Sequence, residues 1–441
     1  MTALLLKLWS QVRSSFWFYP SLMALLAVVL AFATIALDER VTDKWLSSQD
    51  WVYTGGAAGA TAVLQTIAGS MITIAGVVFS LTLVALSLAS SQFGPRLLSN
   101  FMSDVSTQVV LGTFVATFLY CLLILRTLRH DTDELFVPHL SITLGVVFAL
   151  CSLWVLIYFI HHVSVSIQAD EIIARVSREL DQGTERLFPE RVGEAEQRRA
   201  DHRDVQQPDF DADARPVEIV GDGYLQIVNA HALLELAVER DLTLKVLHRP
   251  GHYLVDGTTL LEVHPGERLD DELSKRLRGL FALGSKRTPA QDFEFSINQL
   301  VEIAVRALSP GVNDPFTAIT CVDRIGSLLV KLATRDMPSS ERFDEQGRLR
   351  VLAPAITYPA LVEASLNQIR QHARNDVAVT LRLLETLAVA AGHVTREPDR
   401  AALRRQADML HRGADASFSE EQDRLAAQER YEAVTRVLDV S

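Results

Sequence analysis

The chain has 441 residues, with 42 lysines and arginines against 54 aspartates and glutamates, and its formal net charge is −12. An acidic balance of this size argues against binding to nucleic acid, because phosphate recognition needs a basic surface. The charge is unevenly distributed. Residues 1–165 hold 7 basic and 8 acidic residues, so the rest of the chain carries almost all of the net charge. The length allows two or three domains, and we expect a membrane domain followed by an acidic soluble domain.

Four apolar runs predict a transmembrane domain over residues 1–165, because each is long enough to span a bilayer as a helix. The aromatic cluster Phe16–Tyr19 before the first run is typical of the membrane interface. The first run is long and ends in charged residues, which disfavours a cleavable signal peptide. The predicted spans are residues 17–37, 65–91, 107–125 and 139–160.

The second run lies in a segment, residues 51–95, that contains no charged side chain. Five hydroxyl residues and two valines in it recur at alternating steps of three and four, which places them on one narrow stripe of a helix. A helix from Ala57 to Ser91 would be about 52 Å long at 1.5 Å per residue, and Gly94-Pro95 would end it. The hydroxyl residues are Ser70, Thr73, Ser80, Ser87 and Ser91, and the valines are Val77 and Val84.

This stripe has two interpretations. It lines water in a pore, or it packs closely against another helix, since small residues let helices approach each other. No ionisable residue falls in the middle of a span, which argues against a proton-coupled transporter. A passive pore lined by hydroxyls and apolar side chains remains compatible with that absence.

The orientation and the redox environment follow from charge and cysteine usage. An even number of spans places both termini on one side of the membrane, and the basic residues near that side slightly outnumber those on the other, which favours cytoplasmic termini in an inner membrane. The three cysteines, Cys121, Cys151 and Cys321, lie far apart. They form no disulfide framework and fit a reducing compartment for the soluble part.

The soluble part is predicted to have an α+β fold. Residues 166–215 read as a juxtamembrane helix and a linker, residues 216–265 as a small β-rich module, and residues 266–441 as a mainly helical cytoplasmic domain with a bundle at its end. The stretch HRPGHYLVDGTTLLEV resembles biotinyl/lipoyl-like β-sandwich domains, but no lysine stands at the hairpin, so we expect a structural module only. His248, His252 and His264 lie in or next to this module, and we expect no metal site there.

The sharpest turn signals lie between two predicted helices of the soluble part. Thr288 is expected to cap the first helix, with Gln291 as its capping partner, and that helix is expected to run to about Leu308. Asn313 or Asp314 is expected to cap the second helix, with Pro315 in its first turn. Glu302 and Arg306 are four residues apart and should pair.

The corner between these two helices also has two interpretations. In the first, its polar residues only shape a turn and cap helices. In the second, they line a ligand site or the vestibule of a pore. The candidate residues of this cytoplasmic motif are Asp292, Arg306, Ser309, Asn313 and Asp314.

The segments SPGVNDPFTA, RTPAQDFEFSIN and FSLTLVALSLASSQFGPR resemble a large bacterial family of predicted inner-membrane proteins with a domain of unknown function. The resemblance covers nearly the whole chain. It implies four spans followed by a cytoplasmic domain, and it implies no activity and no catalytic residue.

No nucleotide-binding loop, dinucleotide fingerprint, zinc-protease motif or nucleophile elbow occurs in the chain, so we do not expect an enzyme, a cofactor or a metal. Two functional hypotheses remain. The first is a homo-oligomeric channel in the lipid bilayer that passes ions or small solutes along the striped span. The second is a non-conducting scaffold or sensor in which the stripe is a seam between helices.

Overall fold

The computed structural model describes residues 16–40, 53, 56–94, 104–128, 137–188 and 210–440. The chain divides between Glu171 and Ile172 into two compact units.

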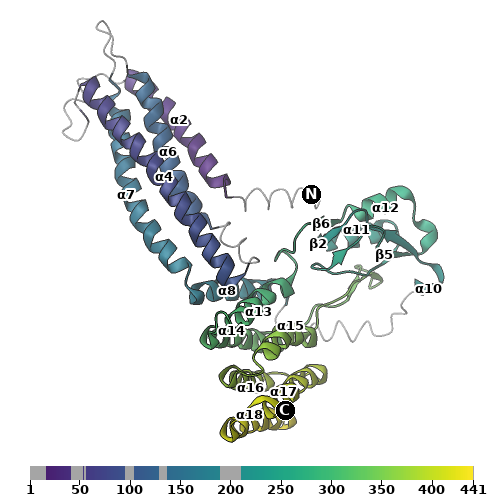
Figure 1. Ribbon diagram of the computed structural model, residues 1–441. Coiled ribbons are helices and arrows are strands. Elements are labelled where there is room, and N and C mark those ends of the chain that lie inside the picture. The colour runs from purple at the N-terminus through teal and green to yellow at the C-terminus, as the bar shows by residue number, and fades with distance from the viewer. Residues whose placement is uncertain are drawn as a thin grey trace. The chain divides into compact units, whose positions relative to one another are not determined.

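The first unit is a bundle of four apolar helices (Figure 1). Each of the four is long and apolar enough to span a membrane, so the predicted fold class is confirmed for this part of the chain. Helix α6 contacts the other three helices and has the largest buried share among the spans. The four helices are α2 (Phe18–Arg40), α4 (Ala57–Phe93), α6 (Val105–Thr127) and α7 (His139–Ser166).

Helix α4 is the longest of the four, with 37 residues. At 1.5 Å per residue it measures about 55 Å, whereas a bilayer core is about 30 Å thick. The helix begins at Ala57 and ends at Gly94, whose φ of 110° lies in the region that favours glycine. Helix α4 therefore tilts or extends beyond the hydrocarbon layer.

A buried carboxylate joins the ends of α2 and α7. The side chain of Asp38, 8% exposed, accepts hydrogen bonds from the backbone N–H of Leu140 at 3.0 Å and of Ser141 at 2.9 Å. The Ser141 hydroxyl donates a third bond to it at 2.6 Å, and the Tyr120 hydroxyl donates to the Ser141 carbonyl at 3.1 Å. The free N–H groups at the start of α7 are thus satisfied by a carboxylate, which the helix dipole also favours.

The second unit contains two β-sheets. One has the strand order β1-β5-β3-β8-β7 and the other β4-β2-β6. Buried side chains from both sheets and from helices α11 (Ala230–Glu239) and α12 (Asp271–Arg278) form one core. Helix α10 is Phe210–Asp213, and a 3₁₀ turn covers Gly266–Arg268. The strands are β1 (Arg215–Glu218), β2 (Gly223–Val228), β3 (Thr243–Val246), β4 (Tyr253–Leu254), β5 (Thr259–His264), β6 (Phe281–Gly284), β7 (Glu341–Phe343) and β8 (Leu349–Leu352).

The last two strands return to this sheet from far along the chain. Strands β7 and β8 form an antiparallel hairpin with Gly347 at its turn, at a φ of 77°. Strand β8 then pairs in parallel with β3, with Leu244 opposite Val351. Two helices lie between β6 and β7 in the sequence. The sheet is therefore completed only by residues that follow those helices.

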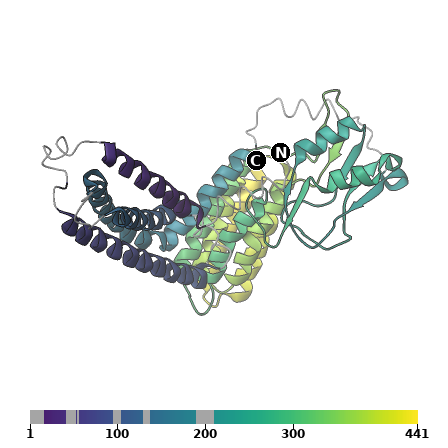
Figure 2. The same cartoon turned by 90° about the horizontal axis from the view of Figure 1, so that it is seen from above.

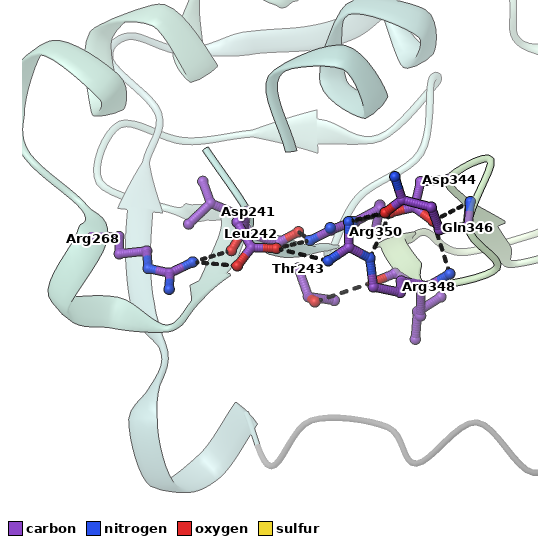
Figure 3. A network of polar contacts seen from close by, with 9 residues as sticks. Asp241, Leu242, Thr243, Arg268, Asp344, Gln346, Arg348 and Arg350 are labelled. Carbon is purple, nitrogen blue, oxygen red and sulfur yellow. Dashed lines mark hydrogen bonds and ion pairs between the residues drawn. The ribbon is translucent and has the colours of Figure 1, made fainter. Parts of the chain in front are cut away.

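A network of charged side chains fixes the returning hairpin (Figure 3). Arg350 and Asp344 are both 4% exposed and bond at 2.8 Å, and Asp344 also accepts from Arg348 Nε at 3.0 Å. Arg350 Nη1 reaches Asp241 at 2.9 Å, and Asp241 is also bound by Arg268. Burial would raise the pKa of Asp344, but the hydrogen bonds it accepts from Arg350 and from the backbone outweigh burial and lower its pKa to about 2.

The remaining helices of this unit stack in two rows (Figure 1). Helices α13, α15 and α17 form one row, and α14, α16 and α18 form the other. Figure 2, turned by 90°, looks along the stack, so that these helices overlap. Helix α8 (Ala169–Leu187) packs at the start of the stack, where the rings of Phe188 and Phe293 lie 4.9 Å apart. The rows consist of α13 (Phe293–Ala307), α14 (Pro315–Ala333), α15 (Tyr358–His372), α16 (Val377–Ala391), α17 (Glu397–Ser417) and α18 (Glu421–Val440).

Candidate functional site

The predicted hydroxyl stripe lies on the exposed side of α4. All seven of its members are exposed, and further small residues at helical spacing lie on the same side. We call this surface the small-residue face. It consists of Ala62, Thr66, Gly69, Ser70, Thr73, Gly76, Val77, Ser80, Val84, Ser87 and Ser91.

The opposite side of α4 packs within the unit. Its buried residues contact helices α6 and α7 and are on average larger than those of the small-residue face. The stripe is therefore not the seam between the four helices of one chain. The buried residues include Leu64, Ala68, Met71, Ala75 and Val78.

The exposed surfaces of α2 and α7 differ from the small-residue face. Large apolar side chains such as Leu25 and Phe32 on α2, and Leu150 and Trp154 on α7, are well exposed. Side chains of this kind suit contact with lipid tails. Helix α4 also exposes large apolar side chains, such as Phe79 and Leu83, but the small-residue face contains no leucine or aromatic residue.

The hydroxyls of the small-residue face bond to their own helix. Thr73 donates to the Gly69 carbonyl at 2.8 Å, and Ser80 donates to the Gly76 carbonyl at 2.9 Å. Such bonds let a hydroxyl sit in an apolar environment without another partner. Each oxygen still has lone pairs with which to accept a hydrogen bond or contact a cation.

Gly69 and Gly76 belong to this face, although the sequence analysis assigned only hydroxyl and valine positions to it. A Cβ atom added to either glycine would meet nothing within 4 Å. Their spacing of three and four residues from Thr73 and Ser80 is the signal that could have placed them there. Because glycine has no side chain, the surface of the helix is recessed at Gly69 and Gly76, next to the hydroxyls of Thr73 and Ser80.

In the second unit, the corner between α13 and α14 has the capping geometry expected for its second helix. Asp314 accepts from the Thr317 backbone N–H at 3.1 Å and from the Thr317 hydroxyl at 2.6 Å. Ser309 donates to the Arg306 carbonyl at 2.6 Å. Asn313 has a φ of 49°, which asparagine tolerates better than most residues. In these contacts Asp314 caps α14 and Ser309 takes part in the turn.

The start of α13 differs from the expectation. Asp292, not Thr288, caps this helix, accepting from the Phe295 N–H at 3.1 Å. Gln291 does not act as a capping partner. Its amide bonds to the backbone N–H and C=O of Val228 on β2 at 2.9 and 3.2 Å. The sequence pattern of a capping box was misleading, because the Gln291 side chain instead hydrogen-bonds to the backbone of β2, which is far away in the sequence.

Asp292 is held by a second charged group. Arg287 binds its two carboxylate oxygens at 2.6 and 2.9 Å. Gly251, with a φ of 98°, approaches so closely that a Cβ atom there would lie 2.4 Å from Asp292 Oδ2. Arg249 from the same turn pairs with Glu294 at 2.6 Å. This cluster fastens the start of α13 to the turn before β4.

The structure does not bring Asp292 to the corner. Asp292 and Asp314 cap successive helices, and the 15 residues of α13 between them span about 22 Å. Arg306 lies near the corner and pairs with Glu302 at 3.5 Å, as expected. Phe316, the second residue of α14, is 78% exposed. The motif thus consists of a corner (Arg306, Ser309, Asn313, Asp314) and a separate capping residue.

No group of three or more histidine, cysteine or carboxylate side chains suited to a metal ion occurs among the described residues. His248 and His252 are neighbours, with ring centroids 5.9 Å apart. Burial, followed by the nearby charge of Arg249, lowers the pKa of His252.

The described parts define a multi-pass membrane protein with a large α+β domain. A family model described as predicted membrane protein (DUF2254) matches residues 13–389, and the chain belongs to this family. An uncharacterized protein of Mycobacterium bovis and one of Mycobacterium tuberculosis are each 34% identical over 379 residues, which cover 85% of this chain and 71% of the relative. No solved structure matches the chain.

Proposed function

We propose that this protein forms a homo-oligomeric channel in the inner membrane, in which the small-residue face of α4 lines the path of ions or small solutes. The observation that carries the proposal is the position of that face: it is exposed in the single chain and lies opposite the side of α4 that packs on α6 and α7. A second copy of the chain is the partner that would cover it. Closed rings are common among such assemblies.

Three properties favour a wet path over a lipid-facing surface. The face is lined by hydroxyls at regular intervals, and the oxygens of Thr73 and Ser80 keep lone pairs that can accept a hydrogen bond or contact a cation. It carries no ionisable side chain, so a permeating ion meets no fixed charge on α4. The length of α4 allows the path to continue beyond the hydrocarbon core. Pores of this kind select by diameter, by hydrogen-bonding groups and by apolar constrictions.

A second candidate is a non-conducting scaffold or sensor. Gly69 and Gly76 favour it, because glycines on an exposed face allow two helices to approach closely. In that case the small-residue faces of two copies form a dry contact, and the soluble domain responds to a partner. Both candidates place copies of the chain against α4, and only the first requires conductance. Neither assigns an enzymatic step to the chain.

The test is conductance of the purified full chain in planar bilayers, under voltage and under membrane tension. Ser80→Phe should lower the unitary conductance, because a large ring replaces a small side chain on the face. Leu81→Phe is the matched control, since Leu81 is exposed on α4 but outside that face. A wild-type protein that passes neither ions nor small solutes under any of these conditions removes the channel proposal and leaves the scaffold.

The orientation is tested separately. We propose that both termini lie in the cytoplasm, as the distribution of basic residues favours. A reporter that is active only after export, fused after Ser441, should stay inactive, and a cytoplasmic reporter at the same place should be active. The reverse pattern would place the soluble domain outside.

A further inference from the structure

The row formed by α13, α15 and α17 brings arginines of two helices together. Helices α15 and α17 run side by side in the same direction. Asn367 on α15 bonds Gln406 on α17 at 2.8 Å, and Arg374, just past the end of α15, bonds Ser417 at the end of α17 at 2.9 Å. Between these two contacts α15 carries Arg370 and α17 carries Arg412. The two guanidinium groups therefore lie on facing stretches of neighbouring helices.

These arginines lack acidic partners. Among the residues that the structure describes, no carboxylate forms an ion pair with Arg370, Arg374 or Arg412. The Nε atom of Arg370 is buried and has no hydrogen-bond partner. Burial, followed by repulsion from Arg412, lowers the pKa of Arg370 below its ordinary value. The positive charges of Arg370 and Arg412 thus lie close together, and neither forms an ion pair with a carboxylate of the described residues.

Two other arginines on α17 do have acidic partners. Arg404 pairs with Asp439, and Arg405 pairs with Glu363 at 3.4 Å. Asp408 and Asp415 lie one turn from Arg412 on α17, but Asp408 accepts from the Tyr431 hydroxyl at 3.0 Å and Asp415 pairs with His411 at 3.4 Å, so neither forms an ion pair with Arg412. A buried donor without a partner and two neighbouring like charges without an ion pair both raise the free energy of the folded state. A bound anion would remove both costs.

We propose that Arg370, Arg374 and Arg412 form a binding site for a phosphate-bearing ligand. Guanidinium groups bind phosphate oxygens through paired hydrogen bonds, and an arginine cluster suits a group of two negative charges better than a single carboxylate. The ligand is a soluble phosphate ester or the headgroup of a phospholipid. The site lies within the second unit and does not depend on whether α4 lines a channel.

The experiment measures binding of inorganic phosphate to the full chain in phosphatidylcholine nanodiscs, by calorimetric titration at constant ionic strength balanced with chloride. Wild type should bind phosphate. Arg412→Gln and Arg370→Met should each raise the apparent dissociation constant by at least about tenfold, because each removes a charged hydrogen bond. Arg405→Gln removes one positive charge from the same helix, and its dissociation constant should stay at the wild-type value.

Addition of phosphatidylglycerol to the nanodiscs distinguishes the two sources. If a headgroup occupies the site, this lipid should weaken phosphate binding to wild type and leave Arg412→Gln unchanged. If the natural ligand is soluble, phosphate binding should be the same in both lipid compositions. Either result supports the site.

Wild type that does not bind phosphate in either lipid composition, or an Arg412→Gln variant that binds as tightly as wild type, overturns the proposal. Arg412 is exposed, so that variant should fold.

Discussion

In the membrane unit Thr73 and Ser80 of α4 bond to their own helix, whereas in the second unit Arg350 bonds to another element. Thr73 and Ser80 each reach a carbonyl four residues earlier. Arg350, by contrast, connects Asp344 of its own hairpin to Asp241, more than a hundred residues earlier. A group satisfied within its own helix contributes little to tertiary structure and leaves the surface around it free for a partner. A group satisfied across elements holds the fold together.

The membrane unit also contains a polar group of the second kind. Asp38 accepts three hydrogen bonds from the start of α7. Polar residues in this unit therefore divide into those that join helices and those that face outward. Substitutions of each kind should differ strongly in their effect on stability.

Asp38→Ala should lower the free energy of unfolding of the membrane unit by about 3 kcal/mol, because it leaves two N–H groups at the start of α7 without their acceptor. The measurement is the unfolding midpoint in mixed detergent micelles. Glu39→Ala, one residue further along and exposed, is the control and should be close to wild type. Equal midpoints for the two variants would show that Asp38 does not join α2 to α7.

Arg350→Met should destabilise the second unit by about 2 kcal/mol, because Asp344 remains buried without its main partner. Chemical denaturation followed by circular dichroism measures this loss. Arg348→Met changes a more exposed arginine that binds the same carboxylate, and it should cost less than half as much. Similar losses for both variants would mean that burial of Arg350 does not matter.

The stability of the second unit should depend on pH through Asp344. Its pKa is about 2 in the folded chain against an ordinary value of 3.8, so the folded state favours the charged carboxylate. The stabilisation is complete above about pH 4 and is lost as the pH falls towards 2. Asp344→Asn should flatten the stability profile in this window. An unchanged slope in that variant would assign the acid sensitivity to other groups.

Arg382→Gln should have a small effect, about 0.5 kcal/mol, because its partners are partly exposed. Arg382 lies between Asp323 on α14, at 2.5 Å, and Glu385 on its own helix, at 3.2 Å, and Glu385 also binds Arg430 on α18 at 2.7 Å. Added salt should lower the stability of wild type slightly and leave the variant unaffected. A loss above 2 kcal/mol would mean that this row of ion pairs holds the helices of the stack together.

Ser80→Ala should leave stability unchanged to within about 0.5 kcal/mol, since the hydroxyl bonds only to its own helix. Gly76→Leu tests the same face with a large side chain in open space, and it should be equally stable in the monomer. It should alter the oligomer observed by native mass spectrometry. A destabilised monomer would mean that the small-residue face contacts the chain's own helices.

Much of the fold could be predicted because it follows from local patterns. The four spans follow from long apolar runs, and the β-rich module predicted for residues 216–265 contains strands β2, β3, β4 and β5 and most of β1. Helix α11 between β2 and β3 went unrecognised because Ala230–Glu239 is short and nearly continuous in apolar residues. The pairing of β3 with β8 could not be predicted, since it joins residues more than a hundred positions apart and no local signal marks it.

The candidate sites could likewise be predicted where they follow from local sequence patterns, but not where they depend on packing between elements. The period of the hydroxyl residues predicts that they share a side of α4, but only packing decides which side is covered. The cap at Asp292 was missed because Thr288-Pro289 has the better local pattern. In the structure, the carboxylate of Asp292 is held at the start of α13 by its ion pair with Arg287 and by the close approach of Gly251. The cluster of Arg370 and Arg412 was not expected, because it requires knowing that α15 and α17 are neighbours.

The return of β7 and β8 also has a consequence for synthesis of the chain. Leu244 on β3 pairs with Val351 on β8. During translation this edge of β3 therefore has no partner strand until roughly a hundred further residues have been synthesised. At about 5–20 residues per second, that interval is roughly 5–20 s. During it, the edge of β3 is unpaired while α13 and α14 emerge. Until the hairpin is synthesised, β3 is therefore paired on one edge only, with β5.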